Sequence, residues 1–207
     1  GLIRFFLIFD NPFLHSSIML RRSLIETHAL RYDPAYPHSE DYELWARCAE
    51  LTELANLPEV LVRYRYHADN VSHRFSREQD VAGGAVRARL VKALGFKVST
   101  VDLQRHQALA ELQLESWSEL EWAKVWLDQV LAIGCRQYGI PEAAMHSHLS
   151  RMWYGNCGKV ADSGWRAFRL FWSSPVGRAA ALEWKVKLGL RCLLRRRIPA
   201  DRAELQP

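Results

Sequence analysis

Apolar side chains recur at short intervals through the first part of the chain and indicate several short elements. Residues 2–9 are almost uniformly apolar, and we expect a helix there that ends before Pro12, because the residue before a proline avoids helical geometry. The stretch 15–22 predicts a short strand. Residues 40–51 repeat apolar side chains at helical spacing, with Ser39 as the expected N-cap.

A strict alternation of side chains over residues 60–67 predicts a second strand with two different faces. The packed face would carry Val60, Val62, Tyr64 and Tyr66, and the cationic face Leu61, Arg63, Arg65 and His67. Beyond this segment the alternation of period two stops.

From residue 76 onward the apolar pattern has the period of a helix. We expect helices over residues 76–94, 101–115 and 117–133, and further helices after Pro141, Asp162 and Pro175. Ser116 and Glu119 form a capping box at the start of the third helix. The pattern predicts a helix-rich α+β protein, with a mixed domain over residues 1–75 and an α-helical domain over residues 76–207.

Positive charge is concentrated near the end of the chain. The whole chain carries a net charge of +5, and residues 178–197 hold seven Lys and Arg side chains against the single acidic Glu183. Within this segment one side of a helix would gather Leu182, Val186, Leu190, Leu193 and Leu194. Two interpretations remain open: a helix lying on an anionic membrane surface, or a packed terminal helix with a solvated basic rim.

Cysteine spacing and hydropathy narrow the class of protein. The four cysteines are scattered without a C-x-x-C pair, which argues against a zinc site or a disulfide framework and favours reduced thiols in the cytoplasm. No apolar stretch approaches the roughly 20 residues that span a bilayer, so we expect at most a peripheral contact with the inner face of the plasma membrane. No nucleic-acid reader motif accompanies the basic charge, so we expect no nucleic-acid partner.

Two adjacent carboxylates, Glu40 and Asp41, open the helix over residues 40–51. Acidic side chains in a first helical turn interact favourably with the helix dipole, each by about 0.3–1 kcal/mol. Taken alone, the pair is therefore explained by helix formation. The alternative is a pair that faces a substrate.

Four segments that follow one another favour the second explanation, in which the acidic pair faces a substrate. They read NPFLHSSIMLRRSL, YDPAYPHSEDYELWARC, ANLPEVLVRYRYH and NVSH. Together they resemble the second half of the family 2 glycosyltransferases, inverting enzymes of the GT-A type, over about residues 5–75. The resemblance implies a partial GT-A module of short strands and helices, followed here by a helical domain.

The resemblance also implies roles for individual residues. Asp41 would be the general base that deprotonates the acceptor hydroxyl, with Glu40 and Tyr42 contacting the acceptor. The donor pyrophosphate would lie near Arg65, His67, Asn11 and His15, and His67 would help to hold a metal ion. Ser72 and His73 belong to a following loop that either folds over the donor or is an ordinary loop.

A nucleotide-sugar donor and a glycan or lipid-linked acceptor would be the partners, in the synthesis of a bacterial-type cell-envelope polysaccharide. The implied cofactor is Mg²⁺ or Mn²⁺, bound mainly by a donor-binding half with a D-x-D motif, and no D-x-D occurs in these 207 residues. We therefore expect a fragment that is inactive in isolation. The alternative is a non-catalytic helical scaffold that carries a degenerate remnant of such an enzyme.

Overall fold

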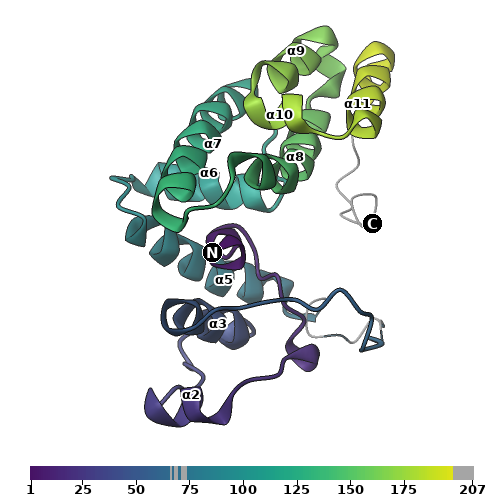
Figure 1. Ribbon diagram of the computed structural model, residues 1–207. Coiled ribbons are helices and arrows are strands. Elements are labelled where there is room, and N and C mark those ends of the chain that lie inside the picture. The colour runs from purple at the N-terminus through teal and green to yellow at the C-terminus, as the bar shows by residue number, and fades with distance from the viewer. Residues whose placement is uncertain (66, 68–69, 71–73, 198–207) are drawn as a thin grey trace. The chain divides into compact units, whose positions relative to one another are not determined.

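The computed structural model describes residues 1–65, 67, 70 and 74–197, apart from the side chains of residues 147 and 148. The chain forms two compact units, Gly1–Lys97 and Val98–Pro207 (Figure 1). The described residues form helices and loops and contain no strand. The α+β prediction, with a GT-A module containing strands, is therefore wrong, and the fold is all-helical. The boundary that the sequence places after residue 75 stays a prediction.

The first unit is built around one helix. Its elements are α1 (Leu2–Phe6), η1 (His15–Ser17), α2 (Arg22–Thr27), α3 (Glu40–Leu51) and α5 (Ser76–Ala93). Helix α3 packs on α5 and on α1 and supplies most of the core of this unit. That core consists of Leu7, Leu30, Tyr42, Leu44, Trp45, Ala46, Cys48, Ala49 and Val86. The helix predicted over residues 40–51 is confirmed.

Ser39 occupies the N-cap position of α3, but its side chain makes no capping hydrogen bond. Its hydroxyl instead donates to the backbone carbonyl of Gln79 in α5, over 3.1 Å. Ser39 therefore joins α3 to α5. The acidic side chains of the first turn of α3 lie near its N-terminal N–H groups in place of a Ser39 cap.

Both predicted strands are absent from the described residues. The stretch 15–22 forms the 3₁₀ turn η1 and the start of α2. Val60 and Leu61 are 90% and 71% exposed, although the alternation would put Val60 on a packed face. A strand is stabilised by its neighbours, and an isolated one is marginal in water. The described part of the chain offers no second strand to pair with, so the alternation produces no sheet.

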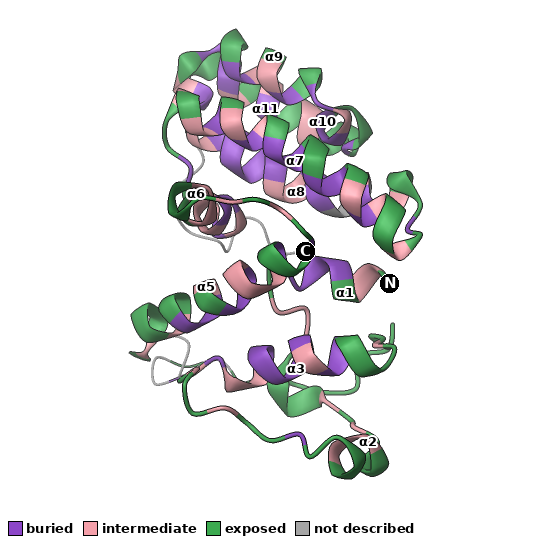
Figure 2. Ribbon diagram, turned by 90° about the vertical axis from the view of Figure 1, so that its left-hand side faces the viewer, coloured by how far each residue is buried: buried purple, intermediate pink, exposed green. Residues whose placement is uncertain are grey.

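The second unit is a set of helices around α8. Its elements are α6 (Thr100–Ala110), α7 (Trp117–Tyr138), α8 (Glu142–Lys159), η2 (Ala161–Ser163), α9 (Trp165–Ser173), α10 (Pro175–Ala179) and α11 (Leu182–Leu194). Helix α8 contacts the other five helices of this unit. Figure 2 shows the buried residues as stripes along α7 and α8.

Local signals account for several of these helix ends. The predicted Ser116–Glu119 capping box is confirmed at the start of α7, and α6 begins with a second one, formed by Ser99 and Asp102. Helix α7 ends at Gly139, whose φ of +62° is the left-handed geometry that glycine adopts most easily. The expected apolar stripe of α7 is buried, namely Leu120, Ala123, Trp126, Leu127, Val130 and Leu131. The N-cap residue of α9 is Gly164, and the carboxylate of Asp162, two residues earlier, pairs with Arg197 at 2.7 Å.

Gly177 lets α10 approach the end of α9 closely. A Cβ atom at this position would lie 1.8 Å from the carbonyl oxygen of Phe171, far inside van der Waals contact. The backbone N–H of Gly177 also donates a hydrogen bond to the hydroxyl of Ser174, at 2.9 Å. Only glycine fits this contact without displacing the backbone.

Two further observations concern the whole chain. Cys48, Cys157 and Cys192 are buried, Cys135 is partly buried, and all four are free thiols. None of the described helices is both long enough and apolar enough to cross a lipid bilayer.

Candidate functional site

The carboxylate of Asp41 lies in the first turn of α3 and is held there from two directions. Its Oδ1 accepts a hydrogen bond from the backbone N–H of Tyr42 at 2.7 Å, and its Oδ2 accepts one from the side-chain amide of Asn11 at 3.2 Å. The Asp41 side chain is 16% exposed, so it is largely withdrawn from water but still reachable. The two hydrogen bonds fix the direction of the carboxylate, and the exposed fraction leaves it reachable from solvent.

Asn11 is oriented by its own loop. Its side-chain oxygen accepts a hydrogen bond from the backbone N–H of Phe13 at 3.1 Å, which leaves the NH₂ group to donate to Asp41. Asn11, which follows the first helical segment, therefore also connects this loop to the first turn of α3. Sequence reasoning placed Asn11 beside the acidic pair, and the structure brings the two side chains into contact.

His15 and Tyr32 complete a short polar chain next to Asp41. The Nδ1 atom of His15 is 3.9 Å from Oδ2 of Asp41, a distance for charge attraction and too long for a hydrogen bond. The other ring nitrogen, Nε2, lies 2.8 Å from the hydroxyl of Tyr32. If that hydroxyl donates, Nδ1 carries the hydrogen that faces Asp41. Tyr32 was not predicted, because nothing local in its sequence indicates that residues 17 positions apart meet here.

The pKa of Asp41 is raised above its ordinary value, mainly because burial disfavours the charged carboxylate. The neighbouring charge of Glu40 raises the pKa further, while the Tyr42 amide, His15 and Asn11 act in the opposite direction. The pKa of Tyr32 is also raised, first by burial and then by the charges of Asp41 and Glu40. A carboxylate with a raised pKa is a stronger proton acceptor once it is ionised.

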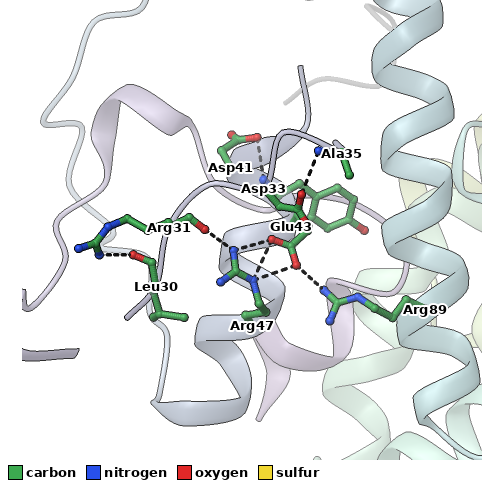
Figure 3. Close-up of polar contacts among 9 residues, drawn as sticks. Leu30, Arg31, Asp33, Ala35, Asp41, Glu43, Arg47 and Arg89 are labelled. Atoms are coloured by element: carbon green, nitrogen blue, oxygen red, sulfur yellow. Dashed lines mark hydrogen bonds and ion pairs between the residues drawn. The ribbon is translucent and has the colours of Figure 1, made fainter. Parts of the chain in front are cut away.

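Glu43, two residues further along α3, belongs to a separate cluster. Arg47 and Arg89 converge on its buried carboxylate, at 2.7 and 3.2 Å, and Arg47 also donates to the backbone oxygen of Arg31 (Figure 3). These contacts join α3 to α5 and to the loop before α3. Of the three acidic residues in the first turn of α3, Glu43 is thus a structural one.

Glu40 and Tyr42 lie on either side of Asp41 in very different surroundings. Glu40 is half-buried at the first position of α3. Tyr42 is only 4% exposed, and its hydroxyl donates to the backbone carbonyl of Leu7. Burial raises the pKa of this tyrosine. Its ring packs α3 against the end of α1 and presents no face to solvent, so the acceptor contact predicted for Tyr42 gains no support here.

Arg65 and His67 are exposed and lie outside the Asp41 cluster. The side chain of Asn70 holds this segment by donating to the backbone oxygen of Arg65 at 3.2 Å and to the hydroxyl of Tyr64 at 3.0 Å. Among the described residues, no hydrogen bond or ion pair joins Arg65 or His67 to Asp41. The predicted loop residues Ser72 and His73 lie outside the described residues.

The described side chains do not fit the predicted metal site. Nowhere among them do three or more His, Cys, Asp or Glu residues gather closely enough to hold a metal ion. His67 is exposed and offers an imidazole nitrogen, whereas Mg²⁺ and Mn²⁺ favour several oxygen ligands. The divalent cation therefore stays a prediction.

A groove of about 920 Å³ lies next to this cluster. Its lining comes from two segments of the chain, residues 12–14 with 17–28 in part and residues 52–62 in part, and from Trp45. Trp45 is one helical turn after Asp41 and therefore lies on the same face of α3, and its ring contacts that of His15 with centroids 6.2 Å apart. Pro12, which follows Asn11, and Trp45, which contacts His15, thus connect the polar cluster to this groove.

Comparison with known proteins gives one informative match. The chain is 35% identical over 74 residues to a protein of Haemophilus influenzae named an uncharacterized glycosyltransferase. The match covers 36% of this chain and 23% of that relative, so the chain spans about a quarter of the length of the curated protein it resembles. No protein-family model and no solved structure matches the chain. The likeness supports a glycosyltransferase-like function and leaves its details open.

Proposed function

We propose that this chain is part of a family 2 inverting glycosyltransferase in which Asp41 is the general base. The observation that carries the proposal is the Asp41 carboxylate itself. It is 16% exposed, anchored by Asn11 and faced by His15, and burial raises its pKa. Unlike Glu43, whose carboxylate is closed off by two arginines, Asp41 keeps part of its carboxylate exposed. The partial likeness to a protein named a glycosyltransferase points in the same direction.

The proposed reaction needs one proton acceptor at this position. A sugar hydroxyl is a poor nucleophile near neutral pH, and removal of its proton during attack accelerates the reaction by about 10²- to 10⁴-fold. The proton passes to the Asp41 carboxylate as the acceptor oxygen bonds to the anomeric carbon. The bond from that carbon to the nucleotide phosphate breaks on the opposite face, the electron pair leaves with the nucleotide, and the anomeric centre is inverted.

The residues around Asp41 would position this base. Asn11 fixes Oδ2, and the Tyr42 amide fixes Oδ1, so the carboxylate cannot rotate freely. His15, held at its far nitrogen by Tyr32, would stabilise the ionised carboxylate. Glu40, half-buried beside the base, would contact the acceptor.

The donor would lie near the YRYH segment. Arg65 and His67 have exposed side chains, and an arginine guanidinium matches phosphate oxygens well. Their assignment to the donor pyrophosphate rests on the resemblance of the YRYH segment. A divalent cation would need ligands beyond the described residues, and no step is derived through it.

The test is an Asp41→Asn substitution in the complete protein, assayed with a panel of nucleotide sugars and saccharide acceptors. Transfer is expected to fall by about 10²-fold or more, because the amide keeps the shape but cannot accept the proton. Donor binding, measured by calorimetry, is expected to be unchanged. Glu50→Gln, an exposed carboxylate near the other end of α3, is the matched control and is expected to retain full transfer.

Undiminished transfer by the Asp41→Asn protein would reject Asp41 as the base. Failure of the complete protein to bind any nucleotide sugar would favour the second candidate, a non-catalytic scaffold built on the helical unit. That alternative draws on the fact that residues 98 onward form a compact helical unit of their own.

A further inference from the structure

The last helix, α11, packs by one side only. Leu188 and Cys192 are buried where α11 meets α8 and α9. The other side of the same helix is apolar as well, but it faces solvent, with exposed fractions of 52% to 74%. The exposed side carries Leu182, Val186, Leu190, Leu193 and Leu194. We call these five residues the leucine face.

Helix α9 extends the leucine face sideways with aromatic rings. The α carbon of Gly189 lies so close to Phe168 that an added Cβ would be 3.6 Å from the ring. Phe168 in turn packs on Trp165 and on Trp172, with ring centroids 5.3 and 5.9 Å apart. Both tryptophans remain about half exposed, at 54% and 46%. The ammonium of Lys185 sits 5.0 Å above the Trp172 ring and links the two helices.

Cationic side chains border this apolar surface. Residues 178–197 contain seven basic side chains and one acidic one, so this segment has a net charge of +6, more than the +5 of the whole chain. The one acidic residue, Glu183, is already paired with Lys187. Arg195 and Arg196, just beyond the end of α11, are exposed. The remainder of the chain is nearly neutral and contributes none of the positive excess.

From this arrangement we infer that α11 and the aromatic side chains of α9, Trp165 and Trp172, bind the surface of an anionic lipid bilayer. Helix α11 lies in the plane of the interface. The aliphatic leucine face enters the boundary between head groups and acyl chains. Indole rings are favoured at that depth, and long basic side chains reach back to the lipid phosphates. A nucleic acid would also attract the charge, but it offers no apolar layer for a row of five aliphatic side chains.

This inference does not rest on the proposed transferase activity, because it uses only residues of the second unit. It also combines the two interpretations that the sequence left open. The packed terminal helix and the amphipathic surface helix are both present, on opposite sides of α11.

The test is sedimentation of the 207-residue chain with vesicles. One set contains equal parts of phosphatidylglycerol and phosphatidylcholine, and the other contains phosphatidylcholine alone. We expect binding to the anionic vesicles that weakens as salt is raised, since the charge contribution is screened. Neutral vesicles are expected to bind at least tenfold more weakly.

Two double variants separate the apolar and the cationic contributions. Leu190→Ser with Leu193→Ser should weaken binding at least about tenfold, because two side chains no longer enter the acyl region. Arg195→Gln with Arg196→Gln should weaken it roughly 30-fold. The matched controls are two exposed valines of the same unit, Val101→Ser with Val125→Ser, and two exposed lysines, Lys92→Gln with Lys97→Gln. Both controls should bind like the unaltered chain, and far-UV circular dichroism should show all four variants folded.

Three outcomes would overturn the inference. The first is failure of the unaltered chain to bind anionic vesicles. The second is loss of binding in the arginine variant with full binding in the leucine variant, which would indicate adsorption by charge alone. The third is binding to a different partner, seen either as tighter binding to duplex DNA than to the vesicles at equal salt, or as a dimer in sedimentation equilibrium that the leucine variant dissociates. Either of these would assign the surface to a different partner.

Discussion

Asp41 sits where two electrostatic influences oppose each other. The first turn of a helix favours a negative charge, through its free N–H groups and the helix dipole, and the Tyr42 amide provides one such donor. Burial acts against the charge and is the larger effect, so the pKa of the carboxyl group is raised. The folded chain therefore holds this group ready to take up a proton, at some cost in stability when it is ionised.

That cost has a definite pH dependence. Because the folded pKa lies above the unfolded one, the folded state binds the proton more tightly, and stability falls as the pH rises from the unfolded value through the raised folded value. Asp41→Asn is therefore expected to increase the free energy of unfolding at pH 7, with a difference that shrinks near pH 4. Urea unfolding of both proteins at pH 7 and pH 4 measures this difference in the free energy of unfolding. The control, Glu50→Gln, should change the free energy of unfolding by less than about 0.5 kcal/mol. Destabilisation of the Asp41→Asn chain at pH 7 would contradict the account.

The sequence predicts some of this site and misses the rest for a physical reason. The position of Asp41 at a helix start follows from local signals, namely the proline-rich loop before it and the apolar spacing after it. The contact between His15 and Tyr32 depends on how two loops fold back on α3, and no local pattern records it. Tyr42 shows the reverse case. Its ring, which the resemblance would place near the acceptor, is 4% exposed and belongs to the core of the unit.

At the scale of elements, helices were predictable and strands were not. Each helix forms its hydrogen bonds within its own segment, so periodicity and a cap such as Ser116 suffice to place it. A strand depends on a neighbour, and the alternation over residues 60–67 carries no information about whether that neighbour is present. Helix ends were less certain. The helix expected over residues 101–115 stops at Ala110, and that expected to end at residue 133 continues to Tyr138.

The junction of α9 and α10 gives a test at this scale. Gly177→Ala is expected to destabilise the second unit by about 3 kcal/mol, because its Cβ would overlap the carbonyl oxygen of Phe171 and force the backbones apart. Gly189→Ala is the matched control within α11. Its Cβ would make an ordinary 3.6 Å contact with Phe168, and alanine stabilises a helix by roughly 0.5–1 kcal/mol relative to glycine. Thermal unfolding of both variants measures the difference, and equal midpoints would refute the proposed overlap.

At the scale of the whole molecule, the chain divides into two units with separate interiors. The core of the first gathers around α3, and that of the second around α8. Fully buried side chains such as Trp153 and Leu127 lie entirely within the second unit. The proposed chemistry belongs to the first unit and the proposed lipid contact to the second, so each can be altered without the other.

We expect the chain from Val98 onward to fold when it is expressed alone. Helical domains of this size usually unfold in a single cooperative step, which circular dichroism during urea titration would show. Leu127→Ala in this shortened chain should cost about 2–5 kcal/mol, as for other fully buried leucines. A broad, non-cooperative transition of the shortened chain would show that the unit has no independent core. The same midpoint for the shortened chain with and without Leu127→Ala would show this too.

The placement of the four thiols makes the two units separately observable. Cys48 belongs to the first unit and the other three cysteines to the second, and burial raises the pKa of Cys48, Cys157 and Cys192. Since the thiolate is the reactive form, an alkylating reagent reaches these sulfur atoms mainly when the surrounding helices open. Peptide mapping after brief alkylation gives the extent of modification of each cysteine. It therefore reports separately how often each unit opens within one intact polypeptide. The natural sequence already contains the reporters, and no label has to be engineered into it.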